Sequence, residues 1–238
     1  HVAVRRQRQM CIRDSCAGVE RAIEIVNRAV EIFDETIFVK HEVVHNKHVI
    51  EQLVKKGVVF VESLETVPDQ SILIYSAHGV SKEISELATK KRLKVFDATC
   101  PLVTKVHFEI HKFASQNIDV VLVGHSGHPE VEGTMGQYIS EKGKIHLVET
   151  NDDIEKLKIE NKNIAYVTQT TLSVDDTKSI VSCLRDKFPN IIGPRKDDIC
   201  YATQNRQEAV KKILEFCNSL IVVGSQNSSN SQLSLIHI

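Results

Sequence analysis

Three cysteines occupy positions where a helix is expected to begin, and such positions favour thiolates. Cys100 directly precedes Pro101, a residue type preferred at the first helical position, and apolar residues follow at helical spacing. Cys16 and Cys200 precede similar segments. Unpaired backbone N–H groups and the positive end of the helix dipole stabilise a thiolate there. Three thiolates leave one position open on a four-coordinate metal, or on one iron of a cubane cluster, and a catalytic metal needs an open position.

Cysteines also have a plain structural interpretation, because an unpaired cysteine is often buried as a small apolar side chain. That interpretation fits Cys183 and Cys217, which fall on apolar helix faces, and we expect both in the core. Cys11 lies in an unusual N-terminal segment and receives no role. With six cysteines and no Cys-x-x-Cys pair, the sequence favours a reducing compartment over a disulfide scaffold or a zinc ribbon.

Three histidines follow segments that are expected to be strands. A single histidine at a strand end is more often a surface or core residue, but three beside small and polar residues favour an anion site. Hydroxyl and amide donors follow a later strand at the expected start of a helix, which is a typical phosphate site; the alternative is an ordinary capped turn. These two groups are His45, His78 and His128, and Ser228, Ser229 and Asn230.

One carboxylate shares a loop with a histidine of this set. Glu130 lies two residues after His128, and Thr170 follows another expected strand end. A carboxylate beside a thiolate centre and a hydroxyl is suited to a proton relay. The alternative is a solvated loop glutamate.

Strands that alternate with helices must bring these residues together. Such alternation predicts an α/β fold with parallel sheets covered on both faces, and ligands in such sheets bind beyond the carboxyl ends of the strands. Ser173 is expected to cap a helix that starts with two aspartates. The expected strands are 37–40, 58–61, 71–75, 95–96, 119–123, 144–148, 164–167, 190–192 and 220–223.

The cysteine spacing predicts three similar lobes of parallel sheet with flanking helices around a central cluster site, the third lobe incomplete. The lobes are placed at 16–99, 100–193 and 194–231. The arginine-rich segment 1–15 and the tail 232–238 are expected to be non-native sequence, with an organelle transit peptide as the alternative for the first.

Charge and hydropathy exclude several classes of protein. Thirty basic and thirty-one acidic residues give a formal charge of −1, which argues against a general nucleic-acid or membrane-surface binder. No apolar run approaches the roughly 20 residues of a membrane-spanning helix, and no signal peptide is evident. We therefore expect neither nucleic acid nor membrane as a partner.

Eight segments, in order, resemble the hydroxymethylbutenyl diphosphate reductase family from Cys16 to about Ser231. Each contains one of the residues singled out above or its immediate neighbours. They are Ala17-Gly-Val, His41-Glu-Val-Val-His-Asn, Ser76-Ala-His-Gly-Val-Ser, Asp97-Ala-Thr-Cys-Pro-Leu-Val-Thr-Lys-Val-His, Gly124-His-Ser-Gly-His-Pro-Glu-Val-Glu-Gly-Thr, Thr168-Gln-Thr-Thr-Leu-Ser-Val-Asp-Asp, Gly193-Pro-Arg-Lys-Asp-Asp-Ile-Cys-Tyr-Ala-Thr and Gly224-Ser-Gln-Asn-Ser-Ser-Asn-Ser.

The resemblance implies the last step of the non-mevalonate isoprenoid pathway. The family removes the allylic hydroxyl of 4-hydroxy-3-methylbut-2-enyl diphosphate and yields isopentenyl and dimethylallyl diphosphate, with ferredoxin or flavodoxin as electron donor. It further implies a [4Fe–4S] cluster on Cys16, Cys100 and Cys200, a proton passed through Glu130, and Thr170 at the substrate hydroxyl. The location implied is the cytoplasm of a bacterial-type cell, or a plastid if the N-terminus is a transit segment. The implied diphosphate ligands are His45, His78, His128, Ser228, Ser229 and Asn230.

The chain departs from the family pattern at both ends. Ile12-Arg-Asp-Ser15 replaces a Pro-Arg-Gly-Phe turn before the first cysteine, and the family continues beyond Ser231. The resemblance therefore leaves open whether this chain holds a cluster and is active. Two other functions stay open: a three-cysteine iron–sulfur lyase resembling quinolinate synthase, and a non-enzymatic phosphate-binding or iron-sensing module.

Overall fold

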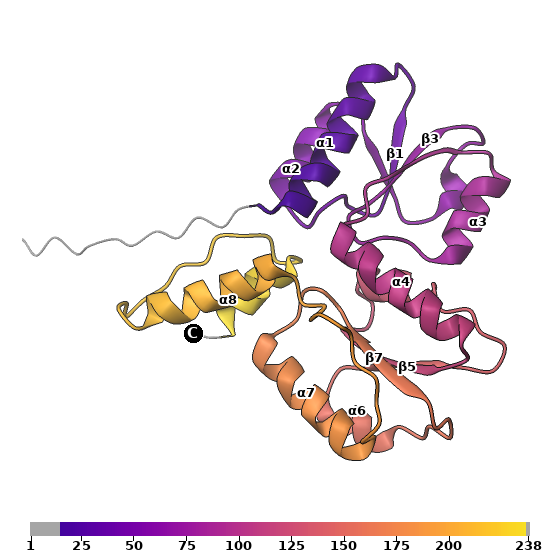
Figure 1. The fold of residues 1–238 in the computed structure, drawn as a ribbon. Helices are drawn as coiled ribbons and strands as arrows, with labels where there is room; N and C mark the ends of the chain where they lie inside the picture. Colours follow the sequence, from indigo (N-terminus) through magenta and orange to yellow (C-terminus); the bar gives the residue numbers. More distant parts are fainter. Residues whose placement is uncertain (1–14, 237–238) are drawn as a thin grey trace, which may run out of the picture.

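The computed structural model describes residues 15–236, and within them two separate parallel sheets are stacked along one axis (Figure 1). The α/β fold class predicted from the alternation of strands and helices is confirmed. The expectations for Cys11 and for most of segment 1–15 lie outside the described residues, as does the end of the tail 232–238. No helix in the described part combines the length and hydropathy needed to cross a membrane.

The first sheet has the strand order β2-β1-β3-β4, with all neighbours parallel. Alternate residues of its strands face opposite sides, as the pleat requires. Ile72 and Ile74 pack into the core beneath α1 and α2, whereas Leu73 and Tyr75 face η1 and α3. The elements are α1 (Ala17–Ile32), β1 (Ile37–Lys40), α2 (Lys47–Lys55), β2 (Val59–Val61), η1 (Leu64–Thr66), β3 (Ile72–Tyr75), α3 (Lys82–Lys90) and β4 (Lys94–Asp97).

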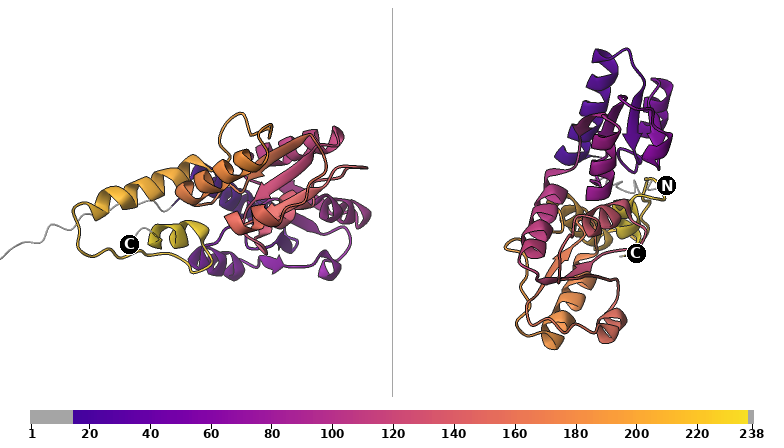
Figure 2. Two further views of the ribbon diagram at one scale, coloured as in Figure 1. Left: turned by 90° about the horizontal axis from the view of Figure 1, so that it is seen from below. Right: turned by 90° about the vertical axis from the view of Figure 1, so that its right-hand side faces the viewer.

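The second sheet has the order β6-β5-β7, again parallel. Val120 and Leu122 face α4 and α5, while Val121 and Val123 face α6 and α7. Helix α4 follows β4 of the first sheet and packs against β5 and β7 of the second, and in the right-hand view of Figure 2 the two sheets lie one above the other. The elements are α4 (Pro101–Ser115), β5 (Asp119–Val123), α5 (Pro129–Met135), β6 (Ile145–Val148), α6 (Asn151–Lys156), β7 (Ile164–Thr168) and α7 (Val174–Lys187).

The last part of the described chain holds α8 (Tyr201–Leu214) and α9 (Ser229–Leu235), which contact each other beside the two sheets. The strand predicted at 220–223 is wrong. Ile221 is 87% exposed and Val223 94% exposed, because no neighbouring strand in residues 15–236 pairs with this segment. The strand predicted at 190–192 is reduced to one parallel bridge, between Ala165 and Ile192.

Local signals for helix starts are confirmed. Ser173 accepts a hydrogen bond from the Asp176 N–H at the start of α7, and Ser81 does the same for Ile84 in α3. Cys183 packs against the core between the second sheet and helices α6 and α7, and it is half-buried. Cys217 is half-buried and lies just past the end of α8, so the core position expected for it is wrong.

The core between the second sheet and helices α4 and α5 supplies a stability prediction. Leu122 in β5 is 1% exposed, so Leu122→Ala leaves a cavity and should lower the free energy of unfolding by about 2–5 kcal/mol. Urea unfolding of the metal-free protein, followed by circular dichroism, measures this. Ile32→Ala is the control, since Ile32 is 71% exposed and its loss should change stability by less than about 0.5 kcal/mol. Equal shifts in the two variants would contradict this account of the core.

Candidate active site

The three cysteines occupy equivalent positions, each as the N-cap residue of a helix. Cys16 precedes α1, Cys100 precedes α4 and Cys200 precedes α8. All three are half-buried and unpaired. The structure brings them together, because Cys16 and Cys200 both act electrostatically on Cys100.

A glycine makes room between two of these thiols. A Cβ placed on Gly18 would lie 2.7 Å from Cys100 Sγ and 3.9 Å from Cys16 Sγ. Any larger residue at position 18 would therefore collide with Cys100. The close approach of α1 to the start of α4 depends on the missing side chain.

Burial and the helix N-terminus act in opposite directions on Cys100. Burial raises the pKa of the Cys100 thiol, and the backbone N–H groups of Leu102 and Val103 lower it. The nearby thiols of Cys16 and Cys200 raise it further. The net shift is upward, so the expected stabilisation of a thiolate by the helix end is present but is outweighed by burial.

The third cysteine, Cys200, is linked through Thr203 to Asn230, one of the residues predicted to bind an anion. The Cys200 thiol donates to Thr203 Oγ1 at 3.1 Å, and that hydroxyl donates to Asn230 Oδ1 at 2.9 Å. Thr203 was not predicted as a site residue. Its position three residues after an N-cap cysteine is the signal that could have identified it.

The three predicted histidines form one cluster. The ring centroids of His45 and His78 are 4.3 Å apart. The ring centroid of His128 lies 5.6 Å from that of His45 and 5.7 Å from that of His78. His45 and His78 belong to the first lobe, and His128 to the second. The histidine cluster therefore lies where the carboxyl ends of strands from both sheets come together.

Burial keeps two of these rings uncharged. Burial lowers the pKa of His128 to about 4, and His45 and His125 add to that shift. Burial also places the pKa of His78 well below its ordinary value, with His45 and His128 acting in the same direction. Neutral rings present one N–H donor each and do not repel one another.

The start of α9 and the residues just before it contact side chains that follow strands of both sheets. Ser229 Oγ lies 3.3 Å from His128 Nε2, and Asn227 Nδ2 donates to Glu42 Oε2 at 2.8 Å and lies 3.4 Å from His45 Nδ1. Ser228 caps α9. Of the predicted residues, Ser229 contacts the histidine cluster directly, Ser228 and Asn230 are its chain neighbours, and Asn227 is a further polar contact that the sequence did not single out.

Glu130 is buried and bound by Thr170. The carboxylate accepts the Thr170 N–H at 2.6 Å on Oε1 and the Thr170 hydroxyl at 2.9 Å on Oε2. Burial raises the pKa of Glu130 to about 7, Asp198 acts in the same direction, and the two hydrogen bonds from Thr170 oppose it. A carboxyl group with such a pKa both holds and releases a proton near neutral pH, so the solvated-loop alternative is wrong.

These residues lie at the two crevices where the strand order reverses. His45 follows β1 and His78 follows β3, which are neighbours in the first sheet although β2 separates them along the chain. Glu130 follows β5 and Thr170 follows β7, which have the same relation in the second sheet. Ligands of open α/β sheets bind at such switch points.

Another glycine fixes the loop that carries His78. Gly79 has φ +76°, and a Cβ there would lie 2.7 Å from Cε1 of His107 on α4. The His78 loop therefore packs directly on the His107 ring, and burial lowers the pKa of His107 to about 4. His107 was not predicted to have a role, although it follows Cys100 by two helical turns.

Three thiols at helix N-termini are the type of donor that an iron–sulfur cluster uses. Within residues 15–236, no three His, Cys, Asp or Glu side chains are arranged to hold one metal ion. A cubane cluster binds each thiolate through a different iron, so the sulfur atoms need not converge on one point. The missing side chain at Gly18 lets α1 approach Cys100 closely, which brings Cys16 and Cys100 near each other, as two ligands of one such group must be.

The fold and site together define an α/β protein that gathers cysteines, neutral histidines and a buried carboxyl group at the strand ends of two parallel sheets. A family profile described as LytB protein matches residues 12–237. The chain belongs to the LytB family.

Two bacterial relatives, each named 4-hydroxy-3-methylbut-2-enyl diphosphate reductase, are similar over most of the chain. The protein of Methylococcus capsulatus is 61% identical over 220 residues, which are 92% of this chain and 70% of that protein. The protein of Nitrosomonas europaea is 59% identical over 220 residues, 92% of this chain and 68% of that protein.

Two solved structures share the fold. The E-1-hydroxy-2-methyl-but-2-enyl-4-diphosphate reductase of Plasmodium falciparum superposes with a TM-score of 0.88 at 47% identity, covering 93% of this chain and 69% of that one. A second, (E)-4-hydroxy-3-methyl-but-2-enyl diphosphate reductase, described as the terminal enzyme of the non-mevalonate pathway, gives 0.72 at 31% identity, covering 93% and 79%.

The pKa of Glu130 predicts a pH-dependent stability. Between its ordinary value of 4.5 and about 7, the folded chain keeps a proton that the unfolded chain loses. Stability therefore falls as pH rises through this window, by on the order of 3 kcal/mol. Unfolding free energies measured from pH 4.5 to 7.5 should show this fall relative to Glu130→Gln, which cannot ionise.

The comparison between the two proteins isolates the effect of Glu130, because His78 and His128 titrate in both. Their lowered pKa values act in the opposite sense, raising stability as pH rises. Parallel pH profiles for the wild type and Glu130→Gln would show that Glu130 has an ordinary pKa.

Proposed function

We propose that this chain reduces 4-hydroxy-3-methylbut-2-enyl diphosphate to isopentenyl and dimethylallyl diphosphate. One observation carries the proposal: three N-cap cysteines, three clustered histidines and a buried proton-holding carboxyl group meet where the two sheets face each other. Relatives at about 60% identity carry the name of this reductase.

The reaction requires two electrons and two protons. The allylic C–O bond breaks, the hydroxyl leaves as water, and a C–H bond forms at one of the two allylic carbons. The carbon at which the C–H bond forms decides which of the two products results. The residues of the chain must therefore bind the diphosphate, orient the hydroxyl and supply a proton at its oxygen.

Diphosphate binding falls to the histidine cluster and the start of α9. His45, His78 and His128 offer ring N–H donors, and Ser228, Ser229 and Asn230 offer hydroxyl and amide donors. An incoming diphosphate favours protonation of nearby histidines, because an opposite charge raises their pKa. His78 and His128, which burial keeps neutral, can thus gain positive charge when a diphosphate binds.

Proton delivery falls to Glu130 and Thr170. Glu130 holds a proton on a buried carboxyl group, and the Thr170 hydroxyl bonded to it is the neighbouring relay position. The ring of His128 is linked to the same site, since its Nδ1 accepts the Glu130 N–H at 3.1 Å. His128 therefore fixes the backbone of Glu130 at the start of α5 while its other ring nitrogen faces the proposed diphosphate site.

Cys16, Cys100 and Cys200 would hold a [4Fe–4S] cluster, which supplies electrons and an open iron position for the substrate hydroxyl. The α1, α4 and α8 N-termini set the spacing of the three sulfur atoms. The electrons come from an external donor, for which ferredoxin and flavodoxin are the candidates.

The cluster assignment is tested by anaerobic reconstitution with iron and sulfide, followed by an iron count and absorption and EPR spectra. The wild type should bind about four irons per chain, and Cys100→Ser should lose most of them. Cys183→Ser is the matched control, because Cys183 lies inside α7, packed against the core beneath it, and not at the N-terminus of a helix. Retention of full iron content by Cys100→Ser would refute the three-thiolate centre.

The catalytic assignment predicts a specific loss in Glu130→Gln. With a chemical reductant as electron source, kcat should fall roughly 100-fold or more with KM little changed, since a general acid acts in the transition state. Product formation is followed by chromatography of the two diphosphates. Glu132→Gln is the control, an exposed carboxylate on the same helix. Equal activities of the two variants would remove Glu130 from the mechanism.

A further inference from the structure

A groove of about 730 Å³ lies on the face of α4 that points away from the second sheet. We refer to it as the α4 groove. Phe108 lines it and is 69% exposed, an unusual exposure for an aromatic side chain in the middle of a helix. None of the residues assigned above to diphosphate binding or proton transfer lines it. The groove is therefore separate from the substrate site.

The rim of the α4 groove is basic. Arg21, Lys105, Lys112 and Arg195 line it, against two acidic residues. Arg21 donates to backbone carbonyls of Thr99 and Asp97, which leaves its charge uncompensated. Lys112 and Arg195 are exposed, and neither forms an ion pair with any described residue. Lys105 alone is bound to a carboxylate at hydrogen-bond distance, that of Asp198.

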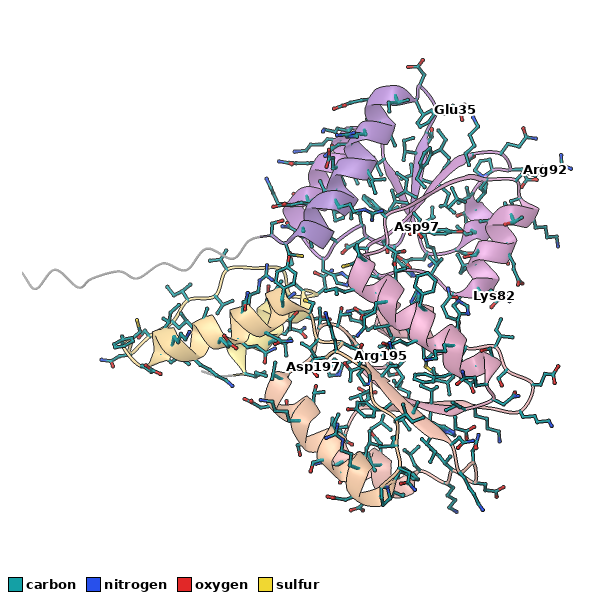
Figure 3. All side chains as sticks on the ribbon, in the orientation of Figure 1. Glu35, Lys82, Arg92, Asp97, Arg195 and Asp197 are labelled. Carbon is teal, nitrogen blue, oxygen red and sulfur yellow. The ribbon has the colours of Figure 1, made fainter. Side chains whose placement is uncertain are left out.

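The groove reaches the chain on both sides of a predicted cluster ligand. Thr99 and Pro101 line it, and Cys100 stands between them. Figure 3 labels Asp97 and Arg195, which border the groove near the start of α4. The shortest covalent path from this surface to the thiol site is therefore one peptide unit.

We propose that the α4 groove is the docking surface for the electron donor, a small acidic redox protein. The proposal rests on the proposed reductase function, which needs two electrons and therefore two one-electron transfers from a reduced donor. A basic rim attracts an acidic partner and accelerates encounter. An exposed aromatic residue at the centre of the patch is typical of interface cores, and a short-lived redox complex needs only a small contact area.

The binding experiment uses the reconstituted protein and a reduced acidic ferredoxin, with flavodoxin as a second probe. Lys112→Glu and Arg195→Glu, alone and together, should weaken ferredoxin binding by roughly tenfold or more and flatten its salt dependence. Arg92→Glu is the matched control. Arg92 precedes β4, at the opposite end of that strand from Asp97, and Figure 3 places it at the outer edge of the first lobe.

Two further measurements separate this proposal from the proposed function. Turnover with a small chemical reductant and the iron content should be the same in all these variants and the wild type, while turnover with ferredoxin falls only in the groove variants. Absence of product with the chemical reductant in the wild type would refute the reductase function and leave the binding titration to judge the docking surface.

The location itself is tested by zero-length carbodiimide crosslinking to ferredoxin and mass spectrometry. Crosslinks at Lys105 or Lys112 support the proposal. Crosslinks confined to lysines of α2, equal weakening by Arg92→Glu, or a chain dimer that occupies the groove and excludes ferredoxin would each overturn it.

Discussion

Parallel pairing sends the carboxyl end of every strand in a sheet to one edge, and the helix that follows each strand begins at that edge. In this chain two such edges face each other across the start of α9. Backbone N–H groups from several helix ends therefore point into one volume, together with the side chains that immediately follow the strands. Cys100 follows β4, and His45, His78 and His128 follow β1, β3 and β5, so the direction of strand pairing brings these four side chains to the facing edges.

The electrostatics of this volume follow from its burial. Burial lowers the pKa of His78 and His128 and raises the pKa of Glu130 to about 7, so each group favours its uncharged form. The rings of His78 and His128, with centroids 5.7 Å apart, are compatible with a folded site because burial keeps both neutral. The two histidines can still donate to an incoming anion, because a nearby negative charge raises the histidine pKa values that burial has lowered.

Much of this arrangement could be predicted from the sequence, because its signals are local. Pro101 indicates that Cys100 is an N-cap residue. The polar Ser76, which follows four apolar residues, indicates the end of β3. The failure at 220–223 has a different cause. Leu-Ile-Val-Val is a strong strand sequence, but a strand exists only when a neighbour pairs with it, and nothing in the local sequence states whether that neighbour is present.

Long-range contacts were equally invisible. The hydrogen bond from Thr203 to Asn230 and the close packing of Gly79 on His107 depend on how helices far apart in sequence are placed. The burial that shifts the pKa of Glu130 is likewise a tertiary property. The sequence identified the chemical groups and their strand ends; their mutual distances required the fold.

The thiols are held in position by the protein itself. Cys100 N–H donates to Ala77 O and Cys200 N–H donates to Thr170 O, so each cysteine is tied to the loop after a neighbouring strand. Asp198 reinforces this, because its buried carboxylate accepts the Thr168 N–H and binds Lys105 of α4, joining the Cys200 loop to the Cys100 helix. A site whose donors are fixed by such contacts loses little conformational freedom when a ligand binds. The same Lys105 contributes to the basic rim of the α4 groove, so the contact that positions two of the thiols also borders the surface through which electrons are proposed to arrive.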